Sequence, residues 1–179
     1  MKKLLLHTCC GPCLTYPGEV LKKEFEVTAF YFNPNIHPKS EYDLRFLNAI
    51  KATEFIGIRI LVGDYLPKSY FQAINSNDKT RCFNCYNLRL EETAKKAKEL
   101  GFKAFSTTLL VSPYQNQELI MKIGDELACC YGVEFISEDF RPGFKEGREA
   151  AMKMELYMQN FCGCTYSFAE KYDDRLERG

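Results

Sequence analysis

Short apolar runs alternate with longer amphipathic runs along most of the chain, and this alternation limits the possible folds more than any other feature. The apolar runs predict strands at residues 2–8, 27–33, 58–64, 102–110 and 133–140. The amphipathic runs predict helices at residues 12–24 (with a break or restart at Pro17-Gly18), 39–57, 87–101, 115–132 and 145–159. Strands separated by helices of this length form βαβ units. We therefore expect a Rossmann-like α/β fold of the HUP or PP-loop type, a mostly parallel sheet with helices on both faces and a cysteine-bearing C-terminal tail.

The length and the charge balance narrow the class of protein. A chain of 179 residues can bury a full hydrophobic core as one domain, residues 1–179. Lysine and arginine together number 24, as do aspartate and glutamate, so the net charge is zero. A protein whose main task is to bind long nucleic acid non-specifically would carry excess positive charge. The balance argues against that class and leaves room for a local basic patch.

The first residues predict neither export nor a membrane anchor. The apolar stretch near Met1 is shorter than the core of a signal peptide, and no small-residue cleavage site follows it. Nowhere does the sequence hold the run of about 20 apolar residues that a membrane-spanning helix needs. We expect a soluble cytoplasmic protein that does not contact a membrane.

Nine cysteines are many for this length, and an odd number in a chain without an export signal is poor material for a disulfide framework. We expect reduced thiols that serve as metal ligands or in redox chemistry. The thiols form four groups along the sequence: Cys9, Cys10 and Cys13; Cys82 and Cys85; Cys129 and Cys130; Cys162 and Cys164.

The first group follows the first predicted strand, in the segment HTCCGPC. Ligands of parallel α/β sheets bind beyond the carboxyl ends of the strands, where the strand order reverses. Gly11-Pro12 predicts that the strand has ended, which lets Cys9 and Cys10 face one site. Cys13 falls in the first turn of the next helix, where the helix dipole favours a thiolate. A functional and a silent Cys13 are equally compatible with this position.

Two further groups have the spacing of metal ligands. Cys82 and Cys85 form a Cys-x-x-Cys just ahead of a predicted helix, and this spacing brings both thiols to one side of a turn. Cys162 and Cys164 flank Gly163, which permits a bend that turns both sulfur atoms toward one centre. The metal-free alternative for this last pair is a redox-active dithiol.

Counting the thiols restricts the chemistry. Cys130 continues the apolar stripe of its helix, so we expect it in the core and assign no chemistry to it or to Cys129. Six strong candidates and Cys13 remain, whereas one zinc ion or one [4Fe–4S] cluster takes at most four thiolates. Either two of the six form a redox pair, or a second metal stands beside the first. Thiolates select iron–sulfur clusters or zinc, and composition does not choose between them.

Histidine and basic side chains are further candidates. His37, in a proline-bounded loop, is expected to contact the substrate, whereas His7 is expected to be a packed and hydrogen-bonded core residue. Lys79 and Arg81 lie beside the Cys-x-x-Cys and Arg89 follows it. These three could contact a phosphate backbone, although most such charges belong to a solvated face.

Two loops follow the fourth and fifth predicted strands and should share the edge of the first cysteines. They hold Tyr114 and Gln115, and Asp139 and Arg141. These side chains suit a polar, ring-bearing substrate. The equally weighted alternative is that they serve only as loop and cap residues, with Arg141 paired to Asp139.

Several segments together resemble one enzyme family: LLLHTCCGPC, YFNPNIHP, RCFNCYNLRLEETAKKAKELGF, STTLLVSPYQNQE, GVEFISEDFRPGFKEG and NFCGC. Over almost its entire length the chain is similar to the cobalamin-independent epoxyqueuosine reductases. The resemblance implies reductive removal of the epoxide oxygen from epoxyqueuosine at the wobble position of tRNA, which yields queuosine. Turning an epoxide into an alkene and water takes two electrons and two protons. The implied partners are therefore a tRNA that carries epoxyqueuosine and an external electron donor.

The resemblance also implies residue roles. The family's cysteine pairs match Cys9/Cys10, Cys82/Cys85 and Cys162/Cys164, which are the implied ligands of an iron–sulfur cluster, of the [4Fe–4S] type, and of an additional iron or zinc ion. Segment 158–179 is expected to return its two cysteines to the site. The catalytic candidates are Cys9 and, as proton donors, Tyr114 and Asp139. The substrate-binding candidates are His37, Arg81, Gln115 and Arg141.

Two other function classes are weighed against this one. A tRNA sulfur transferase related to the ATP pyrophosphatases would share the scaffold, but the loop after the first strand reads CCGPC and lacks the serine- and glycine-rich phosphate cradle of those enzymes. A non-catalytic zinc module that binds RNA would need fewer thiols and more positive charge. ATP consumption would favour the first alternative, and one zinc without redox activity the second.

Overall fold

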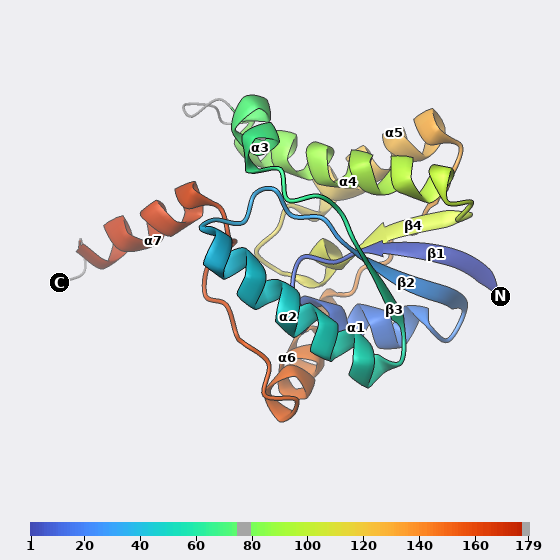
Figure 1. Ribbon diagram of the computed structural model, residues 1–179, viewed down its shortest axis with the longest axis horizontal. Helices are drawn as coiled ribbons and strands as arrows, with labels where there is room; N and C mark the ends of the chain where they lie inside the picture. The colour runs from blue at the N-terminus through green and yellow to red at the C-terminus, as the bar shows by residue number, and fades with distance from the viewer. Residues whose placement is uncertain (75–79, 177–179) are drawn as a thin grey trace.

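One parallel sheet of five strands forms the centre of the protein (Figure 1). The computed structural model describes residues 1–74 and 80–176. Within them the strand order is β3-β2-β1-β4-β5, and all four strand pairs are parallel. The strands are β1 (Lys2–His7), β2 (Phe25–Tyr31), β3 (Arg59–Val62), β4 (Ala104–Thr107) and β5 (Glu134–Phe135). The expected Rossmann-like α/β architecture is confirmed, with a sheet that is entirely parallel.

Helices cover both faces of the sheet, as predicted. On one face α1 (Gly11–Leu21) packs between α2 (Lys39–Ile56) and α6 (Phe144–Lys153). On the other face α4 (Arg81–Glu99) packs against α5 (Gln117–Tyr131). The remaining helical segments are α3 (Pro67–Ala73), α7 (Thr165–Leu176) and the 3-10 turns η1 (Thr108–Val111) and η2 (Arg141–Gly143).

The central strand reads as a continuous apolar run because both of its faces are covered. Leu4, Leu5 and Leu6 are fully buried. A half-exposed strand would alternate apolar and polar residues, whereas a parallel strand between two helical layers does not. At the end of β1, His7 is also fully buried, and its ring hydrogen-bonds to Thr107 Oγ1 at 2.8 Å and to the Phe32 carbonyl at 3.2 Å. Its expected role as a packed core histidine is confirmed, and burial lowers its pKa to about 3.

Several predicted boundaries were wrong. α1 continues through Pro17, because Pro17 and Gly18 are buried, Gly18 against Ile56 of α2, and this packing outweighs one missing hydrogen bond. α4 begins at Arg81, so the Cys-x-x-Cys lies inside its first turns and not ahead of it. The predicted fifth strand shrinks to two residues at the sheet edge. The helices α3 and α7 were not predicted.

Gly124 is required where α5 crosses β5. A Cβ at this position would lie 2.2 Å from the ring of Phe135, which in turn packs against Phe105. We expect Gly124→Ala to lower the free energy of unfolding by about 1–3 kcal/mol, the usual cost of overpacking, as measured by urea denaturation. Glu126→Ala, on the exposed side of the same helix, is the control and should change stability little. Equal effects of the two substitutions would contradict this packing account.

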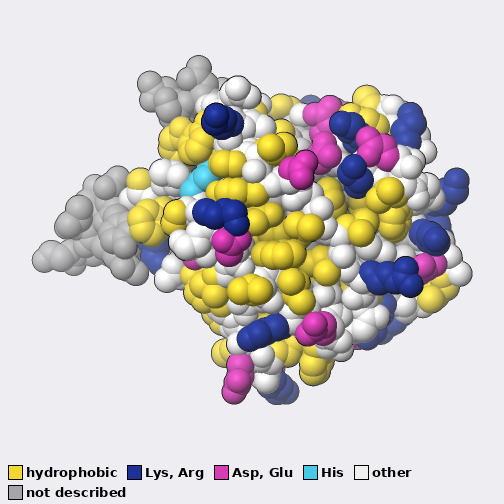
Figure 2. Space-filling view, viewed as in Figure 1, with side chains coloured by type: hydrophobic (Ala, Val, Ile, Leu, Met, Phe, Trp, Pro, Cys, Tyr) yellow, Lys and Arg dark blue, Asp and Glu magenta, His cyan; other side chains and the backbone are white. Residues whose placement is uncertain are grey.

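The outer edge of the sheet is apolar. Figure 2 shows hydrophobic side chains gathered across the middle of the face that carries α2 and β3. Exposed members of these two elements include Leu47, Phe55, Leu61 and Val62. None of the helices in the described ranges combines the length and the apolar character needed to cross a membrane.

Candidate functional site

The chain reverses its strand order between β1 and β4, and the first cysteines lie at that point. β1 ends at His7, β4 ends at Thr107, and the two strands pair side by side. The chain leaves β1 through Cys9 and Cys10 and enters α1 at Gly11. Gly11 permits a close approach of α1 to α2, since a Cβ there would lie 2.5 Å from the Asn48 carbonyl oxygen. Topology therefore places these thiols where α/β sheets bind ligands.

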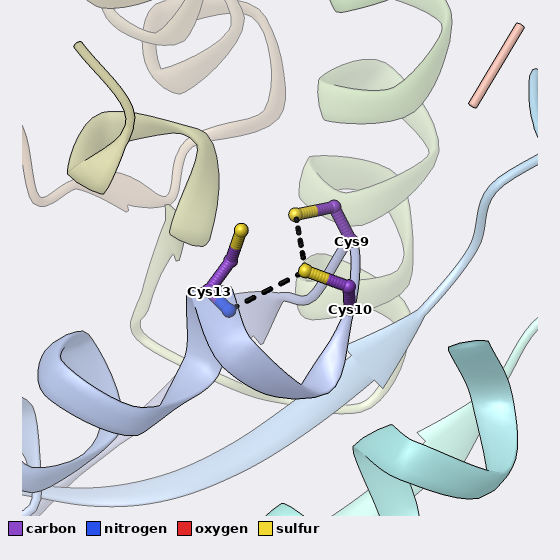
Figure 3. Close-up of side chains that lie close together, drawn as sticks. All are labelled: Cys9, Cys10 and Cys13. Atoms are coloured by element: carbon purple, nitrogen blue, oxygen red, sulfur yellow. Dashed lines mark hydrogen bonds between the residues drawn. The ribbon is translucent and has the colours of Figure 1, made fainter. Parts of the chain in front are cut away.

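Three thiols lie together at this point (Figure 3). The sulfur atoms of Cys9, Cys10 and Cys13 all lie within 4.8 Å of one another, and those of Cys9 and Cys10 are 3.7 Å apart. Cys10 caps α1, because its sulfur accepts a hydrogen bond from the Cys13 backbone N–H at 3.3 Å. The expectation that the strand ends before the two neighbouring cysteines is confirmed, and both thiols reach one site.

The polar surroundings of the three thiols favour one thiolate, on Cys9. Hydrogen bonds with the thiols of Cys10 and Cys13 hold the pKa of Cys9 well below its ordinary value. The pKa of Cys10 is raised by burial, and that of Cys13 is raised by its hydrogen bonds with the other two thiols. Thr108 Oγ1 lies 3.4 Å from Cys9 Sγ, and Gln159 Nε2 donates to Cys10 Sγ at 2.6 Å. The hydrogen bonds with Cys10 and Cys9 thus oppose the effect of the helix dipole on Cys13, and a functional role of Cys13 stays a prediction.

A cavity of about 540 Å³ opens beside these thiols. Cys9 and Cys13 line it from α1 and the loop before it, and Cys162 lines it from the C-terminal segment. Among the described residues, the lining includes the three arginines Arg45, Arg89 and Arg148 and no carboxylate. In a chain with no net charge, this concentration of positive charge suits an anionic ligand.

Side chains of α2 hold the segment that carries Cys162. Arg45 is 2 % exposed, and its two terminal nitrogens donate to the carbonyls of Phe161 and Cys162, both at 3.1 Å. Its Nε donates to Glu41 at 2.7 Å. Gly163 then adopts φ +115°, a conformation that favours glycine, with Arg45 close to the place where a Cβ would stand. The predicted bend at the Cys-Gly-Cys is present, whereas the prediction that it turns both sulfur atoms toward one centre is not confirmed, because Cys162 lines the cavity and Cys164 does not.

The bend sends its two thiols to different surroundings. Cys162 is exposed and lines the cavity, whereas Cys164 is buried in a cluster with Cys85, Tyr70 and Ile74. Burial raises the pKa of the Cys85 thiol to about 12; the Arg89 charge opposes this rise, and the nearby thiols of Cys162 and Cys164 add to it. Cys82, one turn earlier on α4, is exposed. Thiols from α4 and from the C-terminal segment therefore lie close to one another.

Arg89 lies between the two groups of thiols. It is 2 % exposed, lines the cavity and donates from Nη2 to Asn33 Oδ1 at 2.8 Å. Its Nε finds no hydrogen-bond partner among the described residues, and no described carboxylate forms an ion pair with it. The pKa of Arg89 is raised because the thiols of Cys85, Cys9 and Cys162 surround its charge. A buried guanidinium with thiols for neighbours is suited to an anionic thiolate centre.

Besides Cys9, two of the predicted substrate and catalytic residues line the cavity. Tyr114 is 85 % exposed at its mouth. Gln115 accepts a hydrogen bond from the Tyr86 hydroxyl at 2.7 Å and directs its amide nitrogen toward Cys162 Sγ at 4.0 Å.

Other predicted substrate contacts lie outside the cavity lining. The His37 backbone N–H donates to the Gly163 carbonyl at 2.9 Å, and its ring stacks on Phe71 at 4.7 Å. Arg81 forms an ion pair with Glu170 at 2.6 Å. Both residues therefore support the C-terminal segment. Lys79, the other candidate phosphate contact, lies outside the described residues.

Asp139 and Arg141 also lie outside the lining and bind each other. Arg141 donates from Nε and Nη2 to the two carboxylate oxygens at 2.8 and 2.7 Å. This pairing is the alternative expected for them from the sequence. Because the hydrogen bonds from Arg141 lower the pKa of Asp139, its carboxyl group is less suited to donate a proton.

The expected burial of Cys130 was wrong. Both Cys129 and Cys130 are exposed. The buried stripe of α5 runs through Ile120, Ile123 and Leu127, and Cys130 continues it but lies in the last turn of the helix, where it is left exposed. Neither thiol belongs to the cavity lining.

Arg45 was not predicted as a site residue, and Arg89 was expected either to contact a phosphate or to belong to a solvated face. Both occupy the buried stripes of their helices: Arg45 follows Tyr42 and precedes Ala49, and Arg89 lies between Tyr86 and Thr93. An arginine at an apolar position of an amphipathic helix indicates a buried, paired cation. That periodicity was the available signal.

Comparisons with known proteins show the family of this chain. The family model described as epoxyqueuosine reductase QueH matches residues 4–170. Proteins named epoxyqueuosine reductase QueH include one from Thermotoga maritima, 34% identical over 99% of this chain and 96% of its own length. Another, from Dehalococcoides mccartyi, is 33% identical over 95% of this chain and 94% of its own. A third, from Streptococcus pyogenes serotype M1, is 33% identical over 92% and 69%. The chain therefore belongs to the epoxyqueuosine reductase QueH family.

Proposed function

We propose that this chain reduces epoxyqueuosine to queuosine at the wobble position of tRNA. The observation that supports the proposal most directly is the group of three thiols within 4.8 Å beside an arginine-lined cavity at the strand-order reversal. The cavity suits a nucleotide, because its arginines can bind phosphate and its polar side chains can bind a ring-bearing nucleoside. The reaction removes one oxygen as water, so the site must receive two electrons and two protons.

The donor set fits a metal centre built on thiolates. Two thiolates on one tetrahedral ion with bonds of about 2.3 Å lie about 3.8 Å apart, and the sulfur atoms of Cys9 and Cys10 are 3.7 Å apart. The free Nε of buried Arg89 points to an anionic neighbour. The proposed ligands of an iron–sulfur cluster, of the [4Fe–4S] type, and of an adjacent iron or zinc ion are Cys9, Cys10, Cys82, Cys85, Cys162 and Cys164. Such a centre supplies electrons and a Lewis acid for the epoxide oxygen.

The chain's own residues bind and orient the substrate. Gln115 presents its amide to the cavity beside Cys162 and can hydrogen-bond to the base. The Arg89 charge offsets the negative charge that thiolates concentrate in the site. The Tyr114 hydroxyl reaches the cavity mouth and is the better placed of the two proposed proton donors, since Asp139 is held by Arg141. The proposed partners are the tRNA and an external electron donor, both in the cytoplasm.

Turnover with a defined substrate tests the proposal. Protein loaded anaerobically with ferrous iron and sulfide is expected to convert tRNA-borne epoxyqueuosine, with dithionite as reductant, into a nucleoside lighter by one oxygen atom in mass spectrometry. Iron-free protein is the control and should not react. If the loaded protein leaves the epoxide intact, the proposed reaction is wrong. If the iron-free protein turns over fully, the proposed centre is wrong.

A further inference from the structure

A large aromatic side chain stands almost entirely in solvent at the mouth of the cavity. Tyr114 follows the turn η1 and is 85 % exposed, yet it belongs to the cavity lining. Packing in the protein does not explain a ring in this position, because its described ring contact is edge-on to Phe144 at 6.1 Å, with interplanar angle 80°. One face of the Tyr114 ring is therefore available to a ligand that enters the cavity.

A cation lies over the neighbouring Phe144 ring and lines the same cavity. Arg148, one turn after Phe144 on α6, places its guanidinium 5.7 Å from the centre of the Phe144 ring. No described carboxylate forms an ion pair with Arg148, although its neighbour Glu149 lies 4.0 Å from Lys145. The rim thus joins an open aromatic face to a positive charge that is not neutralised by an acidic partner within the described residues.

We propose that Tyr114, Phe144 and Arg148 form a subsite for the nucleotide next to the one being modified. The inference rests on the proposed function and adds a second contact: an unpaired base stacks on Tyr114, and its backbone phosphate binds Arg148. Unpaired loop bases are recognised by stacking on aromatic rings, and single-stranded backbones by arginine. The anticodon loop holds unpaired bases on both sides of the wobble position, so a base follows the target nucleoside to the rim.

An RNA base fits this rim better than a protein surface does. A docking protein would need a mainly apolar area around Tyr114, whereas the cavity lining holds the polar Ser112, Gln115 and Arg148 besides apolar residues such as Val111 and Phe144. The cavity interior adds Arg45 and Arg89 and no described carboxylate. A single open ring beside cations, at the entrance to a positively charged pocket, is suited to a base attached to a polyanion.

Binding of a synthetic anticodon stem–loop RNA tests the subsite. With iron-loaded protein, Tyr114→Ala is expected to weaken binding about tenfold, the usual effect of losing one stacked base. Tyr114→Phe keeps the ring and should bind as wild type does. Phe55→Ala removes another exposed ring, 70 % exposed on α2 and outside the cavity lining, and should also leave binding unchanged.

Two further measurements identify what the ring and the cation contact. RNAs that lack the base on one or the other side of the wobble position should bind wild type more weakly. With one of these RNAs, Tyr114→Ala should cause no further loss of affinity, because the base that stacks on the ring is already missing. Arg148→Gln should reduce the slope of log affinity against log salt by about 0.7, the value for one single-strand phosphate. Arg59→Gln, at an exposed position on β3, should leave the slope unchanged.

The outcomes separate this inference from the proposed function. If Tyr114→Ala weakens the binding of both base-lacking RNAs as much as that of the intact loop, the stacking subsite is wrong. The same holds if Tyr114→Ala does not weaken binding at all, and either result is compatible with reduction of epoxyqueuosine by wild type. If Tyr114→Ala slows turnover only with a protein electron donor and not with dithionite, the rim contacts that donor and the inference is overturned. Failure of wild type to reduce the epoxide would instead refute the proposed function.

Discussion

A Cys9→Ala variant is expected to lose its iron and to reduce epoxyqueuosine more than about 100-fold more slowly than wild type. Loss of a residue that only supports a metal ligand lowers metal affinity or activity by about 10–100-fold, and loss of a direct ligand should lower them further. Cys9 is the thiol held as a thiolate by its neighbours, it lines the cavity, and its sulfur lies 3.7 Å from that of Cys10. Iron and acid-labile sulfide per chain, measured after anaerobic loading, and the rate of queuosine formation report the loss.

The matched control for this substitution is Cys129→Ala. Cys129 is exposed on α5 and belongs neither to the cavity lining nor to the group of three thiols. We expect it to keep iron, sulfide and turnover at wild-type levels. Loss of iron in Cys129→Ala, or full iron and turnover in Cys9→Ala, would contradict the division of the nine cysteines into site and surface. The same assay across the other cysteines would show which thiols hold the cluster and whether Cys13 is needed.

The second large effect is expected at Arg45, whose removal should lower the free energy of unfolding by about 3–5 kcal/mol. Arg45→Ala deletes hydrogen bonds to two backbone carbonyls and leaves the carboxylate of Glu41, 12% exposed, without its cation. Urea denaturation measures the loss. Since the bonds to Phe161 and Cys162 fix the C-terminal segment, alkylation of Cys162 should also become faster, while alkylation of Cys130 should not change.

Two comparisons test whether the buried charge causes the loss. Arg45→Ala combined with Glu41→Gln should recover part of the stability, because no unpaired carboxylate remains in the interior. Arg141→Ala breaks another arginine–carboxylate pair, but one on the surface, with side-chain exposures of 47% and 40%, and should change stability little. A loss at Arg45 no greater than at Arg141 would show that Arg45 does not hold the segment.

Local patterns in the sequence were sufficient to predict the sheet. The apolar run of β1 and the aromatic, β-branched run of β2 have the periodicity of buried strands, and the structure contains them within one or two residues. The position of Cys9 and Cys10 followed from the same pattern, because a loop after a parallel strand lies at the sheet's carboxyl edge. Such inferences hold because strand and helix periods depend on neighbours along the chain.

Boundaries failed where packing outweighed local preference. Pro17 should have interrupted α1, but the helix is continuous because the residue is buried against neighbouring elements. Cys130 should have been buried on its stripe, but α5 ends there and the sheet edge offers only the two residues of β5 to cover it. Both outcomes depend on what lies opposite a residue in space.

The sequence by itself determined the parallel α/β fold, the place of the first cysteines at its ligand-binding edge and the excess of thiols over what one metal centre can use. Only the tertiary structure decided which thiols are neighbours, that Arg45 ties Cys162 to α2, and that Arg89 lies buried among sulfur atoms with no described acidic partner. The physical reason is that periodicity is set by the few residues within one turn or pleat. The contacts that build the site join segments more than a hundred residues apart, such as Cys10 and Gln159, whose hydrogen bond exists only once the sheet has brought them together.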